Sequence, residues 1–583
     1  MDNGLALADY LIVAGFFVIM LVIGLYFSGK MKSLKDFFGA GSQVPWWVSS
    51  VSLYMSTFSA FAFVSYSALA YNDGMVAIVI WWTGVPCWIL SAYFLAARWR
   101  RAASTSPLEF IEQRYGSFLR QGFAWAGVPL IVIDDALKLY VIGKMVTVSL
   151  GTTDTSALLI AIAVCGSIML TYTFLGGLWA VMITDFIQFV VMATAVLVLI
   201  PLVLGELGGI GHLFAGAPEG FWAPTSKDFS CAWLIGFLPI QFFSYSTRWS
   251  LVQRYYAVKT DRDARKVGYL VAALTFFGVP FLFFPAMAAR IFMPGVEDGN
   301  SVYPLLCKQL LPVGMMGMMI AAMFSATMSM LSSDYNAVAS VMTNDIYKRL
   351  FGKAKSERSL VIVGRISTLI IGVLALGVGL LLGNAGEEPN LVKIMASLFG
   401  VLLPPFAVPM ICGLLTRRVS NAGAISGFLA GAACGLAAYA LSYIDGLVIL
   451  RSARCLPWIS SIPAFGLMAL VSALVPDWPD KRQAVARFLD GLGAAALPRA
   501  EERSEDPGAG PGSGLAVSAL QIIGVATSAI GLLLAGSVLT TGRAADGVLS
   551  IGVGVVMLAG GLAMWGGGKA LAGQASRRTG ASQ

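Results

Sequence analysis

Long apolar runs recur along the whole chain, and they constrain its fold more than any other feature. Runs of roughly eighteen or more apolar residues, the length that spans a bilayer as a helix, follow one another through the sequence. The composition agrees, with 57% hydrophobic residues, 12% charged residues and a mean hydropathy of +0.79. Because lipid offers no hydrogen bonds to the backbone, each run must satisfy its own polar groups as a helix. The sequence therefore predicts an all-α polytopic membrane protein, with the lipid bilayer as its surroundings.

Charge and cysteine content exclude several other classes. The formal net charge is +8, but the basic residues lie in short clusters between apolar runs, as they do in cytoplasmic loops. The seven cysteines form no CxxC pair, which argues against a disulfide framework or a zinc site. The chain has no Walker loop, no GxSxG and no GxGxxG after a strand. We therefore expect no enzymatic activity, no nucleic-acid partner, no obligate protein partner and no cofactor apart from a coupling ion.

About fifteen spans are predicted from the apolar runs. They lie at about 8–28, 46–71, 76–97, 121–150, 156–174, 178–204, 231–250, 267–292, 321–348, 360–383, 390–415, 420–444, 457–475, 516–539 and 546–568. The second span has a polar middle, rich in serine, and the fifth and sixth are joined by Gly176 and Gly177. Two glycines in sequence favour a tight turn between helices.

The charges of the loops predict the orientation. Basic loops at 99–120, 252–266 and 348–358 alternate with acidic loops such as 293–300, so the basic loops are expected inside and the N-terminus outside. The first residues are acidic rather than basic, unlike a cleaved signal peptide, so the first span is expected to be kept. These patterns predict a multi-pass protein of the plasma or inner membrane.

The composition changes after Pro476. Residues 476–515 begin charged and become rich in glycine, proline and serine, which is typical of a cytoplasmic linker with one short interfacial helix. Residues 516–568 are predicted to form an additional two-helix transmembrane hairpin, and 569–583 a basic cytoplasmic tail.

Polar residues inside the spans mark candidate sites. In the ninth span, small and hydroxyl residues recur at spacings of three and four, among them Ser325, Ser329, Ser332, Ser333 and Ser340. Such a stripe either packs against another helix or forms the wall of a polar site. Charged residues within spans are costly and mark the other candidates: Asp134, Asp135, Lys138 and Asp185. Asp134 and Lys138, four residues apart, could also simply neutralise each other.

Several segments resemble one transporter family, in the same order along the chain. They are DFFGAGSQVPWW (36–47), TSPLEFIEQRYG (105–116), GGLWAVMITDFIQ (176–188), VQRYYAVK (252–259), NDIYK (344–348), LPPFAVPMICGLLTRR (403–418) and GAISG (423–427). With these the chain resembles the sodium:solute symporter family, which includes sodium–glucose, proline, pantothenate and sialic-acid transporters. The resemblance covers about 1–475, the expected symporter core.

The resemblance implies a leucine-transporter-like fold of two inverted five-helix repeats, at about 46–204 and 231–415. One extra helix precedes the repeats and several follow them. The first helix of each repeat is broken near the middle of the membrane and lines the solute site. The serine-rich middle of the second span fits such a break, and Gly236 and Pro239 predict the corresponding break in the seventh span.

The resemblance also implies ion and solute residues. One sodium site falls on the carbonyls of Met55 and Phe58 and on Ala326 and Ser329, with Met330 in place of a second hydroxyl. A thioether is a poor ligand for a hard cation. A second sodium site falls on Asp185, Ser329, Ser332 and Ser333. The solute positions fall on Thr57, Ala62, Asp134, Ser244, Tyr245 and Ala396.

These positions disfavour a hexose, because several of the hydrogen-bonding residues of the sugar transporters are replaced. Asp134 stands where sialic-acid transporters place an arginine, which suggests a solute with a cationic group. The expected activity is sodium-coupled uptake of a small organic solute by alternating access. Two alternatives remain open: proton coupling with Asp185 as the carrier, and a membrane sensor that binds its ligand without transporting it.

Overall fold

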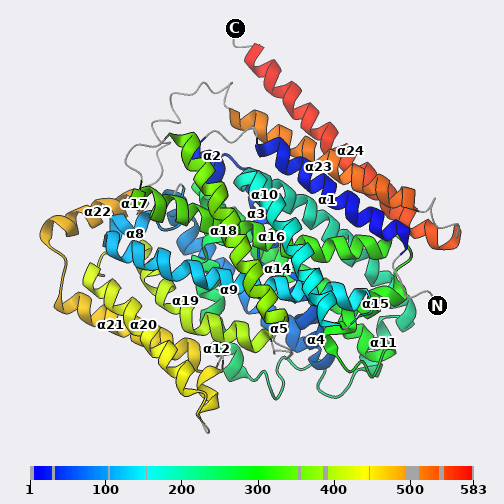
Figure 1. The fold of residues 1–583 in the computed structure, drawn as a ribbon, viewed down its shortest axis with the longest axis horizontal. Helices are drawn as coiled ribbons and strands as arrows, with labels where there is room; N and C mark the ends of the chain where they lie inside the picture. The colour runs from blue at the N-terminus through cyan, green and yellow to red at the C-terminus, as the bar shows by residue number, and fades with distance from the viewer. Residues whose placement is uncertain are drawn as a thin grey trace.

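The computed structural model describes residues 6–28, 33–102, 105–152, 154–351, 356–384, 391–444, 447–452, 454–493, 511–537 and 544–580. The described chain is helical almost throughout (Figure 1). The first helices are α1 (Leu7–Ser28), α2 (Leu34–Gly39), α3 (Trp46–Met55), α4 (Ser67–Asp73), α5 (Met75–Trp82), α6 (Gly84–Ser91), α7 (Ala97–Ala102), α8 (Glu109–Tyr115), α9 (Ser117–Ser149), α10 (Thr155–Leu207) and α11 (Ile210–Gly216).

The later helices include α16, the most deeply buried of the candidate spans. They are α12 (Cys231–Thr247), α13 (Trp249–Tyr256), α14 (Asp261–Phe292), α15 (Val302–Leu310), α16 (Met315–Val341), α17 (Lys348–Phe351), α18 (Glu357–Gly383), α19 (Leu391–Leu415), α20 (Asn421–Leu441), α21 (Leu456–Leu474), α22 (Pro479–Gly493), α23 (Pro511–Gly536) and α24 (Ala544–Gly580).

Twelve helices of the described residues are long and apolar enough to cross a membrane. The other three of the fifteen predicted spans are also helical, and each differs from a simple apolar span for its own reason. The second is interrupted after α3, the fourth (α9) carries several charged residues, and the seventh (α12) has 17 residues. The difference between twelve and fifteen therefore comes from one interrupted helix, one charged helix and one short helix.

Helix α16 forms the centre of the molecule. Its membrane-spanning part is 94% buried, and it packs against α1, α3, α9, α10, α13 and α18. The Asp9 carboxylate of α1 accepts hydrogen bonds from the backbone N–H groups of Gly314 (2.9 Å) and Gly317 (2.7 Å) at the start of α16. This carboxylate satisfies N–H groups that have no partner within the helix, and its charge suits the positive end of the helix dipole.

The predicted turn at Gly176 and Gly177 is present within α10. Gly177 has φ 60° and ψ −179°, and the helix continues on either side of it. The side chain of Phe37 lies against this glycine, about where a Cβ atom would stand. Only glycine adopts this backbone conformation readily, so the residue permits both the bend and the contact.

The predicted break in the seventh span lies elsewhere than expected. Helix α12 continues through Gly236 and Pro239 and ends at Thr247, and the backbone becomes extended at Arg248 (φ −60°, ψ 126°) before α13 begins. A proline removes only one helical hydrogen bond, which this helix tolerates. The break is found where the Arg248 side chain is held by carboxylates of two other helices.

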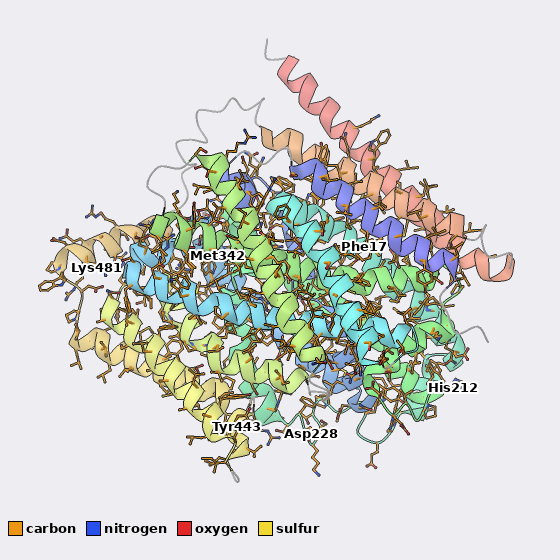
Figure 2. All side chains as sticks on the ribbon, in the orientation of Figure 1. Phe17, His212, Asp228, Met342, Tyr443 and Lys481 are labelled. Carbon is orange, nitrogen blue, oxygen red and sulfur yellow. The ribbon has the colours of Figure 1, made fainter. Side chains whose placement is uncertain are left out.

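The C-terminal helices α23 and α24 pack closely together, and α23 contacts α1 and α10 at the edge of the molecule (Figure 1). Helix α22 lies against α7, α8 and α19 at one end of the spans. Lys481 of α22 and His212 of α11 lie at opposite ends of the molecule (Figure 2). The domain boundaries predicted from composition remain a prediction.

Candidate ion and solute site

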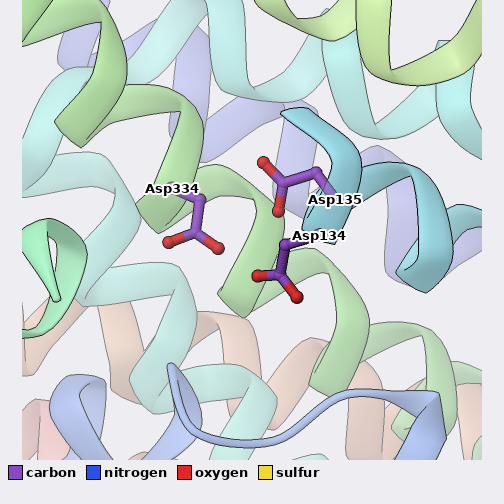
Figure 3. Close-up of side chains that lie close together, drawn as sticks. All are labelled: Asp134, Asp135 and Asp334. Atoms are coloured by element: carbon purple, nitrogen blue, oxygen red, sulfur yellow. The ribbon is translucent and has the colours of Figure 1, made fainter. Parts of the chain in front are cut away.

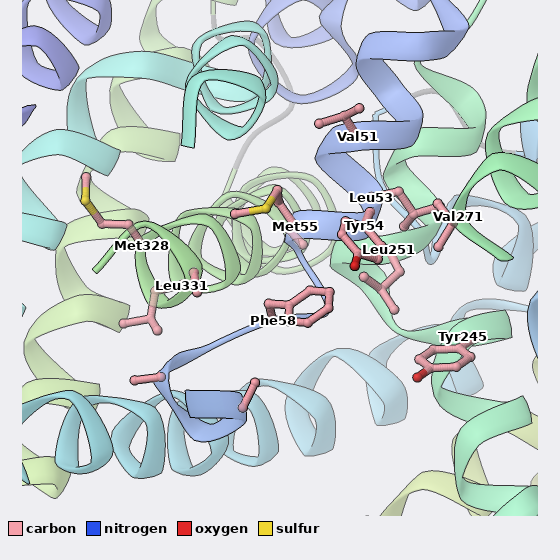
Figure 4. Packing of buried hydrophobic residues seen from close by; sticks show 14 of the residues in the cluster. Val51, Leu53, Tyr54, Met55, Phe58, Tyr245, Leu251, Val271, Met328 and Leu331 are labelled. Atoms are coloured by element: carbon pink, nitrogen blue, oxygen red, sulfur yellow. The ribbon is translucent and has the colours of Figure 1, made fainter. Parts of the chain in front are cut away.

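The second span is broken at Ser56–Ser59, between Met55 at the end of α3 and the next helical turn (Figure 4). Helix α16 bonds both sides of this break. The Thr327 hydroxyl accepts a hydrogen bond from the Ala60 N–H (2.8 Å), and the Ser56 and Ser333 hydroxyls lie 2.9 Å apart. The Thr327 hydroxyl therefore replaces a backbone partner that the break removes, as buried polar groups require, while Ser333 bonds the side chain of Ser56.

Five of the six predicted solute residues line one cavity of about 150 Å³ next to this break. They are Thr57, Ala62, Ser244, Tyr245 and Ala396. Further polar groups on the wall come from Ser56, Ser59 and Gln241, and aromatic rings from Phe61, Tyr66, Trp81 and Phe399. Such a mixture of apolar walls and a few placed polar groups is typical of a small-molecule site.

Two cationic side chains, Lys138 and Arg248, also line the cavity. Behind them lie three buried carboxylates that face one another: Asp134 and Asp135 of α9 and Asp334 of α16 (Figure 3). The Lys138 Nζ lies 2.8 Å from Asp134, 2.7 Å from Asp135 and 2.6 Å from Asp334. We call these five residues the charge network.

Arg248 completes the charge network from the junction of α12 and α13. Its Nη2 atom pairs with Asp134 and lies 2.6 Å from Asp334. The ring of Phe399 lies beside the guanidinium, 5.6 Å from its Cζ atom. Asp134 does not line the main cavity, and its ion pair with Lys138 is the self-neutralising arrangement that the spacing of four residues allows.

The expected second sodium site contains a positively charged side chain, that of Arg254. Asp185 accepts a hydrogen bond from Ser52 (2.5 Å), and the Arg254 Nη2 atom lies 3.3 Å from the same carboxylate oxygen. Arg254 also donates to Ser333. Asp185 and Arg254 are fully buried, so the arginine compensates a charge that would be costly alone.

Oδ1 of Asp185 and the hydroxyl of Ser329 make no hydrogen bond of good geometry among the described residues, although the Asp185 carboxylate and the Ser329 side chain interact with each other. Buried polar atoms normally have a partner, so an ion or a proton is a reasonable occupant. The hydroxyls of Ser332 and Ser333, by contrast, donate to the Ser329 carbonyl at 3.1 Å and 2.7 Å. These two serines bond the backbone of their own helix.

The residues of the first expected sodium site lie around the same break. Met55 ends α3, Phe58 lies in the non-helical stretch, and Ala326 and Ser329 are buried on α16. Met330 lines the cavity. Ser329 is common to the two expected ion sites.

Sequence reasoning missed three residues of this region: Arg248, Arg254 and Asp334. A signal existed for the last two. Arg254 lies within the VQRYYAVK segment, and Asp334 is a carboxylate inside an otherwise uncharged helix. Arg248, beside a helix end, had no comparable signal.

Comparisons with known proteins agree with this architecture. The model of the "Sodium:solute symporter family" matches residues 37–431, more than half of the chain. The "Sodium/sialic acid symporter NanT" of Aliivibrio fischeri is 26% identical over 451 residues, covering 73% of this chain and 86% of that protein. The "Sodium/glucose cotransporter" of Vibrio parahaemolyticus is 28% identical over 467 residues, covering 74% and 84%.

Among solved structures, a substrate-bound, outward-open sodium-coupled sialic acid symporter is similar with a TM-score of 0.69 and 22% sequence identity. The match covers 80% of this chain and 98% of that one, and it shows that the two share a fold. The twelve apolar helices make the present chain a multi-pass membrane protein. On the match over residues 37–431, it belongs to the sodium:solute symporter family.

Proposed function

We propose that this protein imports a small organic solute together with sodium by alternating access. The proposal rests on one observation: the expected solute residues and the expected ion residues both lie at the break after α3. Five expected solute positions line the cavity, and expected ion residues lie behind it on α16. A shared broken helix can transmit the binding of an ion to the binding of a solute.

We propose that coupling depends chiefly on Asp185. Its carboxylate and the neighbouring Ser329 hydroxyl, which are not joined by a hydrogen bond of good geometry, offer oxygen ligands, which sodium requires. The first site has Met330 where the family has a hydroxyl, so it supplies one oxygen fewer. Ser332 and Ser333 stay within the proposed site, because a hydroxyl that donates its hydrogen to the Ser329 carbonyl still has oxygen lone pairs for an ion.

We further propose that the solute carries a hydrogen-bond acceptor or an anionic group. The charged side chains on the cavity wall are Lys138 and Arg248, whereas the carboxylate of Asp134 lies behind them. An amine, which Asp134 alone suggested as the solute, would instead face the positive side chains of Lys138 and Arg248. A cavity of about 150 Å³ holds on the order of ten water-sized groups, which is enough for a small organic molecule.

We also propose an arrangement of the helices and an orientation of the chain in the membrane. The likeness in fold to the sialic acid symporter supports two inverted five-helix repeats, at about 46–204 and 231–415. The loop charges support an external N-terminus in the plasma or inner membrane.

Uptake by proteoliposomes tests the function. A panel of labelled small carboxylates, amines and sugars is offered with a sodium gradient, with a proton gradient and with neither. Sodium-driven accumulation of at least one solute is expected, and Asp185→Asn should abolish accumulation while leaving exchange of solute partly intact. Accumulation driven by protons alone would favour the proton-coupled alternative. Binding without accumulation under every gradient would favour a sensor.

The matched control is Asp73→Asn, at the end of α4, outside both expected ion sites. It should retain sodium-driven accumulation. Full sodium-driven accumulation by Asp185→Asn would show that the coupling ion binds elsewhere.

A further inference from the structure

The charge network contains one more acid than base. Three carboxylates, from Asp134, Asp135 and Asp334, face two cations, from Lys138 and Arg248. All three carboxylates are at most 1% exposed. If all five groups are ionised, the network carries one uncompensated negative charge inside the membrane. An uncompensated buried charge is strongly unfavourable, so a further positive charge is expected there.

A metal ion does not fit this requirement. Ligand oxygens of the three carboxylates lie within 4.8 Å of one another, close enough to share an ion. The ammonium nitrogen of Lys138, however, lies 2.6–2.8 Å from all three carboxylates, in the position that a shared ion would take. The remaining positive charge must therefore be small and bind to a single carboxylate.

Asp135 is the carboxylate with the least compensation. Asp134 and Asp334 each pair with both cations, whereas Asp135 pairs with Lys138 alone. Its Oδ2 atom is buried and has no hydrogen-bond partner among the described residues. The other ionisable groups that face it are Asp134 on the same helix and Asp334 and Tyr335 on α16.

We propose that the charge network is a proton-binding site and that the exchangeable proton is carried by Oδ2 of Asp135. A hydronium ion of the aqueous phase gives up one proton: its O–H bond breaks, an O–H bond forms on Oδ2 of Asp135, a water molecule remains, and the charge of the network changes from −1 to 0. Lys138 lines the cavity and bonds Asp135, so the site adjoins the cavity. It is distinct from Asp185, which has its own arginine.

The proton also determines what the cavity offers to a solute, and this part rests on the proposed function. With the proton bound, the network is neutral and presents N–H donors to the cavity. Without it, the excess negative charge lies just behind the wall. Rising pH should therefore weaken the binding of an anionic solute and strengthen that of a cationic one.

Infrared titration of the purified full-length protein in detergent, without solute, tests the site directly. A protonated buried carboxyl group has a carbonyl band that a carboxylate lacks. The wild type should show this band and lose it at high pH. Asp135→Asn and Asp334→Asn each leave two acids against two bases, so both should lack the titrating band. Either variant suffices if the other fails to fold.

Two further variants test whether the intensity of the band follows the number of acids in excess of bases. Lys138→Met leaves three acids against one base and should roughly double the band. Asp185→Asn removes a carboxylate that is already paired one to one and should leave the band unchanged. Absence of the band from the wild type at every pH would overturn the proposal. So would its loss in Asp185→Asn, its persistence in Asp135→Asn, or its removal by saturating sodium. A transport defect alone has no bearing on these readings.

Discussion

Arg254 places a permanent positive charge against Asp185 in the interior of the molecule, 3.3 Å from its carboxylate. Removing one partner of a buried ion pair leaves the other charge uncompensated. Arg254→Met should therefore lower the free energy of unfolding by about 3–5 kcal/mol at low sodium. The proposed sodium ion would bind the folded state alone, so sodium should recover part of this loss. Thermal unfolding in detergent at low and high sodium measures both effects.

Arg262→Met is the control, because this arginine is exposed at the start of α14. An exposed side chain of this kind should change the free energy of unfolding by less than about 0.5 kcal/mol. If sodium stabilises Arg254→Met no more than the wild type, sodium does not bind at Asp185.

Met330 is the other single position with a clear expected effect. Met330→Ser supplies a hydroxyl oxygen where the first expected sodium site has a thioether. An added ligand worth about 1 kcal/mol should lower the sodium concentration for half-maximal uptake about fivefold. Met395→Ser introduces the same hydroxyl elsewhere on the cavity wall and should leave sodium dependence unchanged. Weaker activation by sodium in Met330→Ser would contradict the assignment of this site.

At the scale of helices, the bend of α10 depends on one glycine. A Cβ atom on Gly177 would stand 3.0 Å from the Phe37 side chain, and φ 60° with ψ −179° is a conformation essentially restricted to glycine. Gly177→Ala should therefore lower the free energy of unfolding by about 1–3 kcal/mol. Gly205→Ala, in the same helix with nothing within 4 Å, should be neutral or slightly stabilising. Equal thermal stability of the two variants would refute the argument.

Twelve of the fifteen expected spans correspond to long apolar helices, because apolar length is a local pattern. Apolar length predicts α14, α18 and α24, and paired glycines predict the bend in α10. The break at Arg248 was predicted at Pro239 instead, because the sequence shows a helix-breaking residue but not the contacts that hold an extended residue. The sequence indicates only the part of the charge network on α9, namely Asp134, Asp135 and Lys138. It does not show that Arg248 and Asp334 join them, because these two come from other helices far along the chain.

The loops alternate in charge along the chain, basic at 99–120, 252–266 and 348–358 and acidic at 293–300. Helices α8, α17 and α22 lie at one end, and α4, α11 and α15 at the other (Figure 1). The proposed orientation places the first end inside the cell. Cysteines substituted for Arg262 and for Glu297, both exposed, should react with an impermeant reagent from opposite sides of the membrane. The residues Asn3 and Lys353, also suited to such labelling by their loops, lie outside the described residues.

A Cys231→Ser background removes an exposed cysteine that would react on its own. In intact cells, label should reach residue 297 and not residue 262 until the membrane is permeabilised. Labelling of both from the same side would disprove the proposed topology.

The Asp185–Arg254 pair has an electrical consequence. In a carrier whose ion site holds an unpaired carboxylate, the return of the empty site moves a negative charge across the membrane potential. The rate of that return step then depends on membrane voltage. Here the arginine cancels the carboxylate, so the empty return should be insensitive to voltage at this site. Voltage should act instead on the sodium-loaded step, in which one added charge gains about 2.3 kcal/mol per 100 mV. A negative interior would thus hasten inward movement without slowing the return.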